Sequence, residues 1–110
     1  MRWIVLALAV WPGSALADWV RVDSDVAVRA ALAGREVVYD AHTSQGFGAD
    51  GTTLHVTERA AQGRWEARGG QYCSLWSPST EWTCYDLDIN DNRLGFTGPG
   101  GSVGEGVYAE

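Results

Sequence analysis

The sequence predicts an all-β fold with a minor α part: one short N-terminal helix, then six or seven antiparallel strands forming a small barrel or a curved sheet. Short runs of alternating apolar and polar residues follow one another from Arg35 onward. Turn signals separate these runs at Asp50-Gly51, Gly69-Gly70 and 98–101. A meander of short strands favours closure, because closure removes exposed sheet edges.

The first 17 residues have the pattern of a cleaved secretory signal. A positive start precedes nine apolar residues from Trp3, and Ala15 and Ala17 occupy the small-residue positions before a cut. An uncut N-terminal strand or helix is the alternative. We expect cleavage before Asp18, a periplasmic or secreted location, and a single disulfide-stapled domain over residues 18–110.

The charge excludes some partners. The net charge is −6, and removal of the signal would leave seven basic against fourteen acidic residues. Such a surface repels phosphates and anionic lipid, so we expect no nucleic-acid partner. No apolar run reaches the roughly 20 residues of a membrane span. We expect a monomer without a cofactor.

The elements before the first glycine hairpin follow from local signals. Ser24 caps a helix over residues 25–33, and Gly34 ends it. In residues 35–41 the alternation points inward at Val37, Tyr39 and Ala41. In residues 52–58 the alternation predicts that Leu54 and Val56 face inward. It predicts that Thr53, His55 and Thr57 face outward.

The two cysteines predict a disulfide across a hairpin. A four-residue loop, "SPST" at 77–80, makes Trp76 face Glu81, Leu75 face Trp82, and Cys73 face Cys84. Directly opposed cysteines on neighbouring strands suit a disulfide, and secreted small domains use them. Zinc would need about two more ligands, and redox pairs are usually closer in sequence.

The Gly69-Gly70 turn then sorts three strands by face, pairing Arg68 with Gln71. The expected core face carries Trp65, Ala67, Tyr72, Trp76, Tyr85, Leu87 and Ile89. The expected solvent face carries Arg64, Glu66, Arg68, Gln71, Asp86 and Asp88, together with Leu75, Trp82 and both cysteines. On that face Leu75 and Trp82 form an apolar pair, which Arg64 is expected to shelter. Cover by a loop or by the helix is the alternative.

Residues 63–85 carry a recurring aromatic and cysteine pattern. It consists of a Gly-x-Trp, a Tyr-Cys-x-x-Trp and a Trp-x-Cys-Tyr, here Gly63 and Trp65, Tyr72, Cys73 and Trp76, and Trp82, Cys84 and Tyr85. This pattern resembles that of a group of small exported bacterial proteins of unknown function. The resemblance implies a compact periplasmic β domain and brings no activity with it.

Two polar groups suggest metal chemistry. In "DLDINDN" the side chains Asp86, Asp88, Asn90 and Asn92 alternate as the oxygen ligands of a calcium-binding loop do. However, Asp91 stands where such a loop has a glycine, and Thr97 stands where it has a glutamate. These two departures favour the polar face of a strand. If Tyr39 pairs with Val56, then Asp40, His42 and His55 share one face as three zinc ligands. Ordinary surface histidines beside a carboxylate are the commoner explanation.

The favoured function is a non-enzymatic secreted module that binds a protein or cell-envelope partner through Leu75, Trp82 and Arg64, since interfaces use exposed aromatics. An inhibitor of an envelope-degrading enzyme is one alternative. A small metal-dependent hydrolase using Asp40, His42 and His55 is another. No catalytic nucleophile motif is present, because neither histidine belongs to one and both cysteines are paired.

Overall fold

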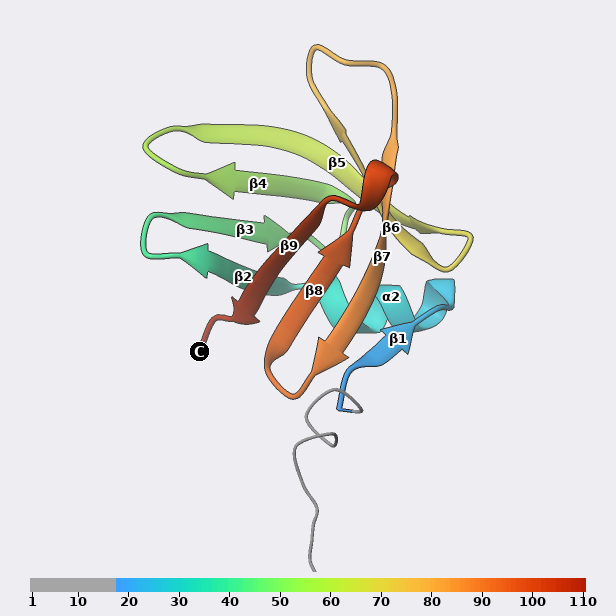
Figure 1. Ribbon diagram of the computed structural model, residues 1–110. Helices are drawn as coiled ribbons and strands as arrows, with labels where there is room; N and C mark the ends of the chain where they lie inside the picture. The colour runs from blue at the N-terminus through green and yellow to red at the C-terminus, as the bar shows by residue number, and fades with distance from the viewer. Residues whose placement is uncertain (1–17) are drawn as a thin grey trace, which may run out of the picture.

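The computed structural model describes residues 18–110 (Figure 1). The predicted signal segment lies outside them. One α-helix and one 3₁₀ turn accompany nine strands: β1 (Val20–Val22), α2 (Asp25–Leu32), β2 (Arg35–Asp40), β3 (Thr43–Phe47), β4 (Thr52–Val56), β5 (Ala60–Arg68), β6 (Gln71–Trp76), β7 (Thr83–Asn90), β8 (Arg93–Thr97), η1 (Pro99–Gly101) and β9 (Val103–Tyr108). Within the described residues, no helix has the length and apolar character needed to cross a membrane.

Strands β2 to β9 form a closed antiparallel barrel, in which each strand pairs with the next along the chain. The barrel closes where β9 returns to β2, with Val38 opposite Val107. This confirms the all-β prediction and the small barrel. The structure has nine strands and the sequence predicts six or seven, because the sequence does not predict β1 and β3. Neither "VRV" nor "TSQGF" has the length or the apolar alternation that identifies a strand.

Strand β1 lies outside the barrel and completes one edge of β7. Strand β6 pairs with the start of β7, where Ser74 faces Thr83 and Tyr72 faces Tyr85. Further along β7, β1 takes over this edge, with Val20 opposite Ile89. The exchange lets β6 diverge from β7 without leaving the backbone groups of β7 unpaired.

Helix α2 packs against the barrel beside β5, β2 and β6 (Figure 1). Ser24 caps it by accepting a hydrogen bond from the Ala27 N–H at 3.1 Å, as predicted. The buried face of α2 consists of Val28 and Leu32. These side chains form the core together with Val37, Phe47, Trp65, Ala67, Tyr72, Leu87, Leu94 and Phe96.

The inward and outward faces of β4 are the reverse of the prediction. Thr53 is buried, at 2 % exposed, whereas Leu54 is 45 % exposed. The Thr53 hydroxyl donates to the Gly46 carbonyl at 2.7 Å and accepts from the Gln45 side chain at 2.9 Å. Strand β3 therefore provides hydrogen-bond partners for the buried Thr53 hydroxyl. The expectation that the apolar residues of β4 face inward is wrong for this reason.

The predicted pairing of β5, β6 and β7 is confirmed through the disulfide. Arg68 faces Gln71, and Cys73 faces Cys84, to which it is bonded. The ladder ends at Ser74, so the predicted pairs of Leu75 with Trp82 and Trp76 with Glu81 are wrong. Local turn bonds replace them: the Ser79 N–H donates to the Trp76 carbonyl at 2.8 Å, and the Glu81 N–H donates to the Ser79 hydroxyl at 3.1 Å.

Candidate ligand-binding cavity

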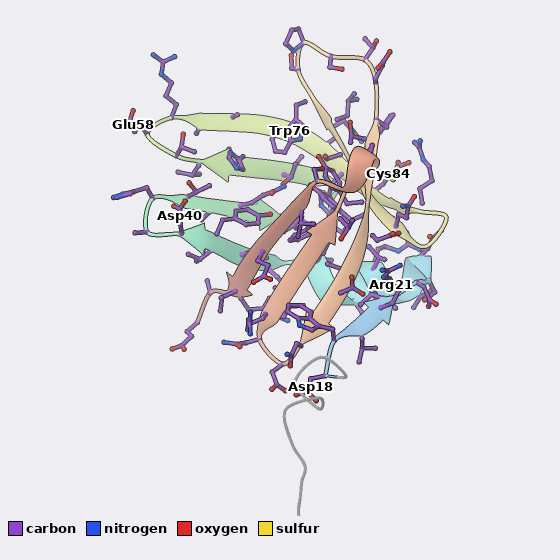
Figure 2. All side chains as sticks on the ribbon, in the orientation of Figure 1. Asp18, Arg21, Asp40, Glu58, Trp76 and Cys84 are labelled. Carbon is purple, nitrogen blue, oxygen red and sulfur yellow. A yellow bond between two sulfur atoms is a disulfide. The ribbon has the colours of Figure 1, made fainter. Side chains whose placement is uncertain are left out.

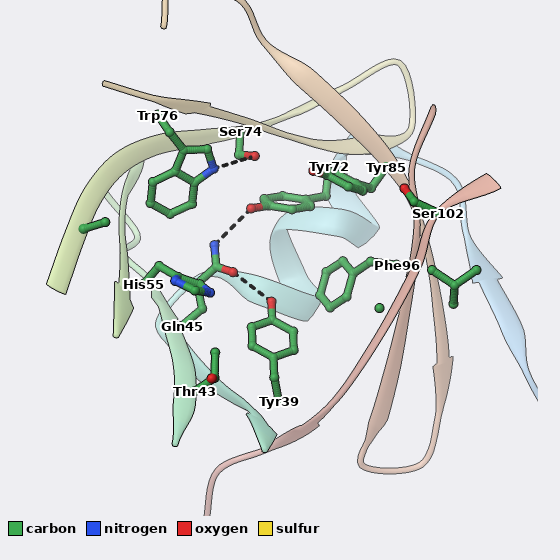
Figure 3. Close-up of a pocket in the computed structure, with 13 residues that line it drawn as sticks. Tyr39, Thr43, Gln45, His55, Tyr72, Ser74, Trp76, Tyr85, Phe96 and Ser102 are labelled. Atoms are coloured by element: carbon green, nitrogen blue, oxygen red, sulfur yellow. Dashed lines mark hydrogen bonds between the residues drawn. The ribbon is translucent and has the colours of Figure 1, made fainter. Parts of the chain in front are cut away.

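The barrel contains a cavity of about 590 Å³ (Figure 3). All eight barrel strands or their connections contribute to its lining, which consists of Tyr39, Thr43, Gln45, His55, Ala61, Tyr72, Ser74, Trp76, Tyr85, Phe96, Ser102, Val103 and Gly104. No carboxylate or guanidinium group is among them. The wall is therefore aromatic with a few neutral polar groups, and His55 is its one side chain that can carry a positive charge.

The aromatic side chains form a continuous wall around the cavity. The Phe96 ring lies 5.6 Å from that of Tyr72 and 6.0 Å from that of Tyr39, measured between centroids. His55 connects Tyr39 to Trp76, with its ring 6.2 Å and 6.0 Å from theirs. These distances are typical of tilted and edge-to-face aromatic pairs, which hold one another in place.

A buried glutamine joins the polar groups of the wall. Gln45 is 4 % exposed; its Nε2 donates to the Thr53 hydroxyl at 2.9 Å and to the Tyr72 hydroxyl at 3.0 Å. The Tyr39 hydroxyl donates to Gln45 Oε1 at 2.8 Å (Figure 3). Desolvation raises the pKa of both phenols above the usual value, so both stay protonated at neutral pH.

Trp76 is part of the cavity wall and is only partly buried, which corrects its predicted place in the core. Its indole N–H donates to the Ser74 hydroxyl at 3.2 Å. The ring packs on Gly63, directly opposite in β5, where an added Cβ would lie 2.6 Å from the indole. Trp65, in contrast, is 5 % exposed and belongs to the core, as predicted.

The structure does not bring Asp40, His42 and His55 together. Strand β3 lies between β2 and β4, so His55 faces Gln45 instead of Asp40. Asp40 accepts the His42 backbone N–H at 2.8 Å in the β2–β3 turn, which lowers the pKa of its carboxyl. Among residues 18–110, no three metal-binding side chains form a group.

The carboxylates of the calcium-like stretch face an arginine and an amide. Asp88 accepts from Arg21 Nε at 2.8 Å, and Asp86 lies 3.4 Å from Arg21 Nη1. Asp86 also accepts from the Gln71 side chain at 3.0 Å. They therefore belong to the polar face where β1 joins β7.

The residues proposed from the sequence as a partner surface lie on the outside of the barrel, but a different arginine stands beside Trp82. Leu75 faces Arg64 as predicted, and Trp82 is partly exposed. The guanidinium over the Trp82 ring is that of Arg68, 5.0 Å from the ring centroid, so the prediction for Arg64 is wrong. Arg68 also forms an ion pair with Glu66, two residues earlier on β5.

The disulfide lies on this outer face, as predicted, and joins Cys73 on β6 to Cys84 on β7 (Figure 2). Cys84 is partly exposed, whereas Cys73 has no exposed surface. The predicted solvent exposure therefore applies to Cys84 and not to Cys73.

Gln45 lines the cavity from a strand that the sequence does not predict. Its hydrogen-bond partner Thr53 is buried, although alternation predicts that it faces outward. The one available signal was the weak polar alternation of "TSQGF" beside "TTLHV". No family model, curated protein or solved structure matches this chain.

Proposed function

We propose that this protein binds a small, neutral and mostly apolar molecule inside its barrel. The observation that carries the proposal is the cavity of about 590 Å³, which is within the usual range for small-molecule sites. Its aromatic wall with a few polar groups is also typical of such sites. Eight-stranded barrels are wide enough to hold one small ligand.

The charge of the ligand follows from the wall. A charged ligand would lose its hydration on entering, and no carboxylate or guanidinium lines the cavity to compensate for that loss. A neutral ligand avoids this cost and gains the burial of its apolar surface, about 25 cal/mol per Å². We therefore propose a binding protein for a neutral, mostly apolar ligand.

We also propose that binding takes place outside the cytoplasm. The Cys73–Cys84 disulfide is compatible with an oxidising compartment, where such bonds persist. The predicted signal segment supports the same location, in the periplasm or after secretion.

The test is a titration with N-phenyl-1-naphthylamine, a neutral dye whose fluorescence rises in apolar surroundings. Ala61 faces the cavity and Ala60 is the preceding residue of β5, so the two side chains point to opposite faces. Both alanines are exposed. Ala61→Trp should fill the cavity entrance and abolish saturable binding, whereas Ala60→Trp should leave it unchanged.

Equal binding by both variants would refute a site inside the barrel. So would a fluorescence rise that does not saturate at one dye per chain. Far-ultraviolet circular dichroism of both variants shows whether the barrel is retained.

A second candidate is the capture of a protein partner at the outer face. The specific observation is that Trp82 remains partly exposed with Arg68 stacked beside it, and Trp and Arg are the residues that dominate interfaces. Trp82→Ala should then abolish partner capture from envelope extract without changing dye binding. Partner capture that survives Trp82→Ala would remove this surface from consideration.

A further inference from the structure

We infer that the Tyr72 hydroxyl donates a hydrogen bond to the ligand, so that the cavity selects flat, neutral molecules with a carbonyl or ether oxygen at their inner end. This inference rests on the proposed function and deepens it. It follows from the direction of the hydrogen bonds around Gln45.

The first step assigns the Gln45 amide. The Thr53 hydroxyl lies 2.7 Å from the Gly46 carbonyl, which can only accept, so Thr53 donates its single hydrogen there. The Gln45 atom 2.9 Å from that hydroxyl must then be a donor. This identifies it as the amide nitrogen, and the amide oxygen is the atom that faces Tyr39.

The second step assigns Tyr72. An amide NH₂ group has two hydrogens, and one of those on Gln45 goes to Thr53. The other points to the Tyr72 oxygen at 3.0 Å, so Tyr72 is the acceptor in this bond. Among the described residues, no acceptor takes the hydrogen of the Tyr72 hydroxyl.

Ser74 is the neighbour that could compete for this hydrogen. Its oxygen already accepts the Trp76 indole N–H at 3.2 Å. Among the described residues, no hydrogen bond joins the Ser74 and Tyr72 hydroxyls: Tyr72 is bonded to Gln45, and Ser74 to the Trp76 indole. The Tyr72 hydrogen therefore stays available to the cavity.

An available donor in a buried place discriminates between ligands. Tyr72 is 4 % exposed, and a donor left without an acceptor after water is expelled loses a hydrogen bond. A ligand with an acceptor oxygen avoids this loss, whereas an alkyl ligand of the same shape does not. Phe96 and Tyr85 flank the Tyr72 ring, at 5.6 Å each, and favour a flat ligand next to it.

The experiment compares 2-acetylnaphthalene with 2-ethylnaphthalene, which have nearly the same shape and differ in the carbonyl oxygen. Both are measured by displacement of N-phenyl-1-naphthylamine. The ketone should bind about threefold to tenfold more tightly, as expected for one neutral hydrogen bond. Tyr72→Phe should reduce the ratio to about one. The matched control Tyr108→Phe removes a partly buried phenol hydroxyl that lies outside the cavity, bonded to the Ala31 carbonyl, and should keep the ratio.

A ratio of affinities is insensitive to partial unfolding, because both probes bind only the folded fraction. If Tyr72→Phe does not fold, the infrared carbonyl stretch of the bound ketone decides on the wild type alone. A hydrogen bond shifts this band to lower frequency than in hexane.

The outcomes separate the two proposals. Equal affinity of wild-type protein for ketone and alkyl probe, or an unshifted carbonyl band, would overturn the role of Tyr72 and leave the cavity proposal standing. Dye binding without binding of either naphthalene would have the same consequence. Failure of the dye and both naphthalenes to bind would overturn both proposals.

Discussion

At the scale of single residues, three tryptophans of one short region have three different environments. Trp65 is in the core and its indole N–H donates to the Gly48 carbonyl at 2.9 Å. Trp76 forms part of the cavity wall, and Trp82 lies on the outer face beside Arg68. Sequence alternation separated Trp82 from the other two, but it could not distinguish a core position from a cavity wall on the same face.

We expect the cost of truncation to follow these environments. Trp65→Ala should lower the free energy of unfolding by about 3–5 kcal/mol, as core aromatics do. Trp82→Ala should lower it by about 1 kcal/mol, since less area is lost there. Trp76→Ala should lower the free energy of unfolding by an intermediate amount, and of the three variants it should weaken dye binding most. Urea melts with dye titrations measure this, and equal destabilisation by the Trp65 and Trp82 variants would contradict it.

The buried phenols predict sensitivity to alkali. Burial raises the pKa of Tyr39 and of Tyr72 above the ordinary value of about 10. The folded chain then holds protons that the unfolded chain releases. Stability from this source is complete below about pH 10 and is lost as the pH rises toward the folded pKa. Tyr39→Phe should make the free energy of unfolding fall less steeply between about pH 9.5 and 11. Parallel wild-type and variant curves would argue against this cause.

At the scale of elements, the β5–β6 hairpin is fixed by its turn. Gly69 and Gly70 have φ values of +60° and +78°, the left-handed region that a tight hairpin needs. Gly70 also approaches the segment before α2, and its N–H donates to the Asp25 side chain at 2.7 Å. The turn therefore holds both the hairpin and the start of the helix.

The two glycines provide a matched pair of variants. An added Cβ at Gly70 would lie 2.3 Å from the Asp23 carbonyl oxygen, whereas one at Gly69 would have no atom within 4 Å. Gly69→Ala should cost about 1 kcal/mol, from its left-handed backbone alone. Gly70→Ala should cost clearly more, because the backbone of Asp23 must move. Thermal melts compare the two, and equal costs would mean that this close approach is not maintained.

The elements also differ in how well sequence could predict them. The helix, its Ser24 cap, the β5–β6 register and the pairing of β6 with β7 at the disulfide depend on residues that are close along the chain, and the structure confirms these predictions. Strands β1 and β3 were missed because each is held mainly by its partners. In β3, for example, the burial of the polar Gln45 is possible because its amide forms hydrogen bonds with Tyr39, Thr53 and Tyr72.

At the scale of the whole molecule, the disulfide and the barrel core are separate sources of stability. The bond joins β6 and β7 on the outer face, across 11 positions of sequence, while the core lies inside. Reduction should therefore lower the free energy of unfolding by about 3 kcal/mol at most, the value expected for closing so short a loop. Far-ultraviolet circular dichroism should stay unchanged. Loss of the β spectrum on reduction would show that the barrel depends on the bond.

The sequence by itself determined the β class, the helix, the glycine turns and the disulfide. Each of these follows from the backbone preferences of a few adjacent residues or from pairing across one short loop. The closed barrel was one of two predicted alternatives, and only the pairing of β9 with β2 selects it. That choice depends on strands separated by most of the chain.

Only the tertiary structure decided the cavity. Strand β3 separates Asp40 from His55, turns His55 and Thr53 inward, and places Gln45 where three distant side chains satisfy its amide. Alternation predicts the opposite, because it assumes that polar groups gain more from water than from the interior. Inside this barrel each side chain of the network makes at least one hydrogen bond, which offsets much of the cost of burying it.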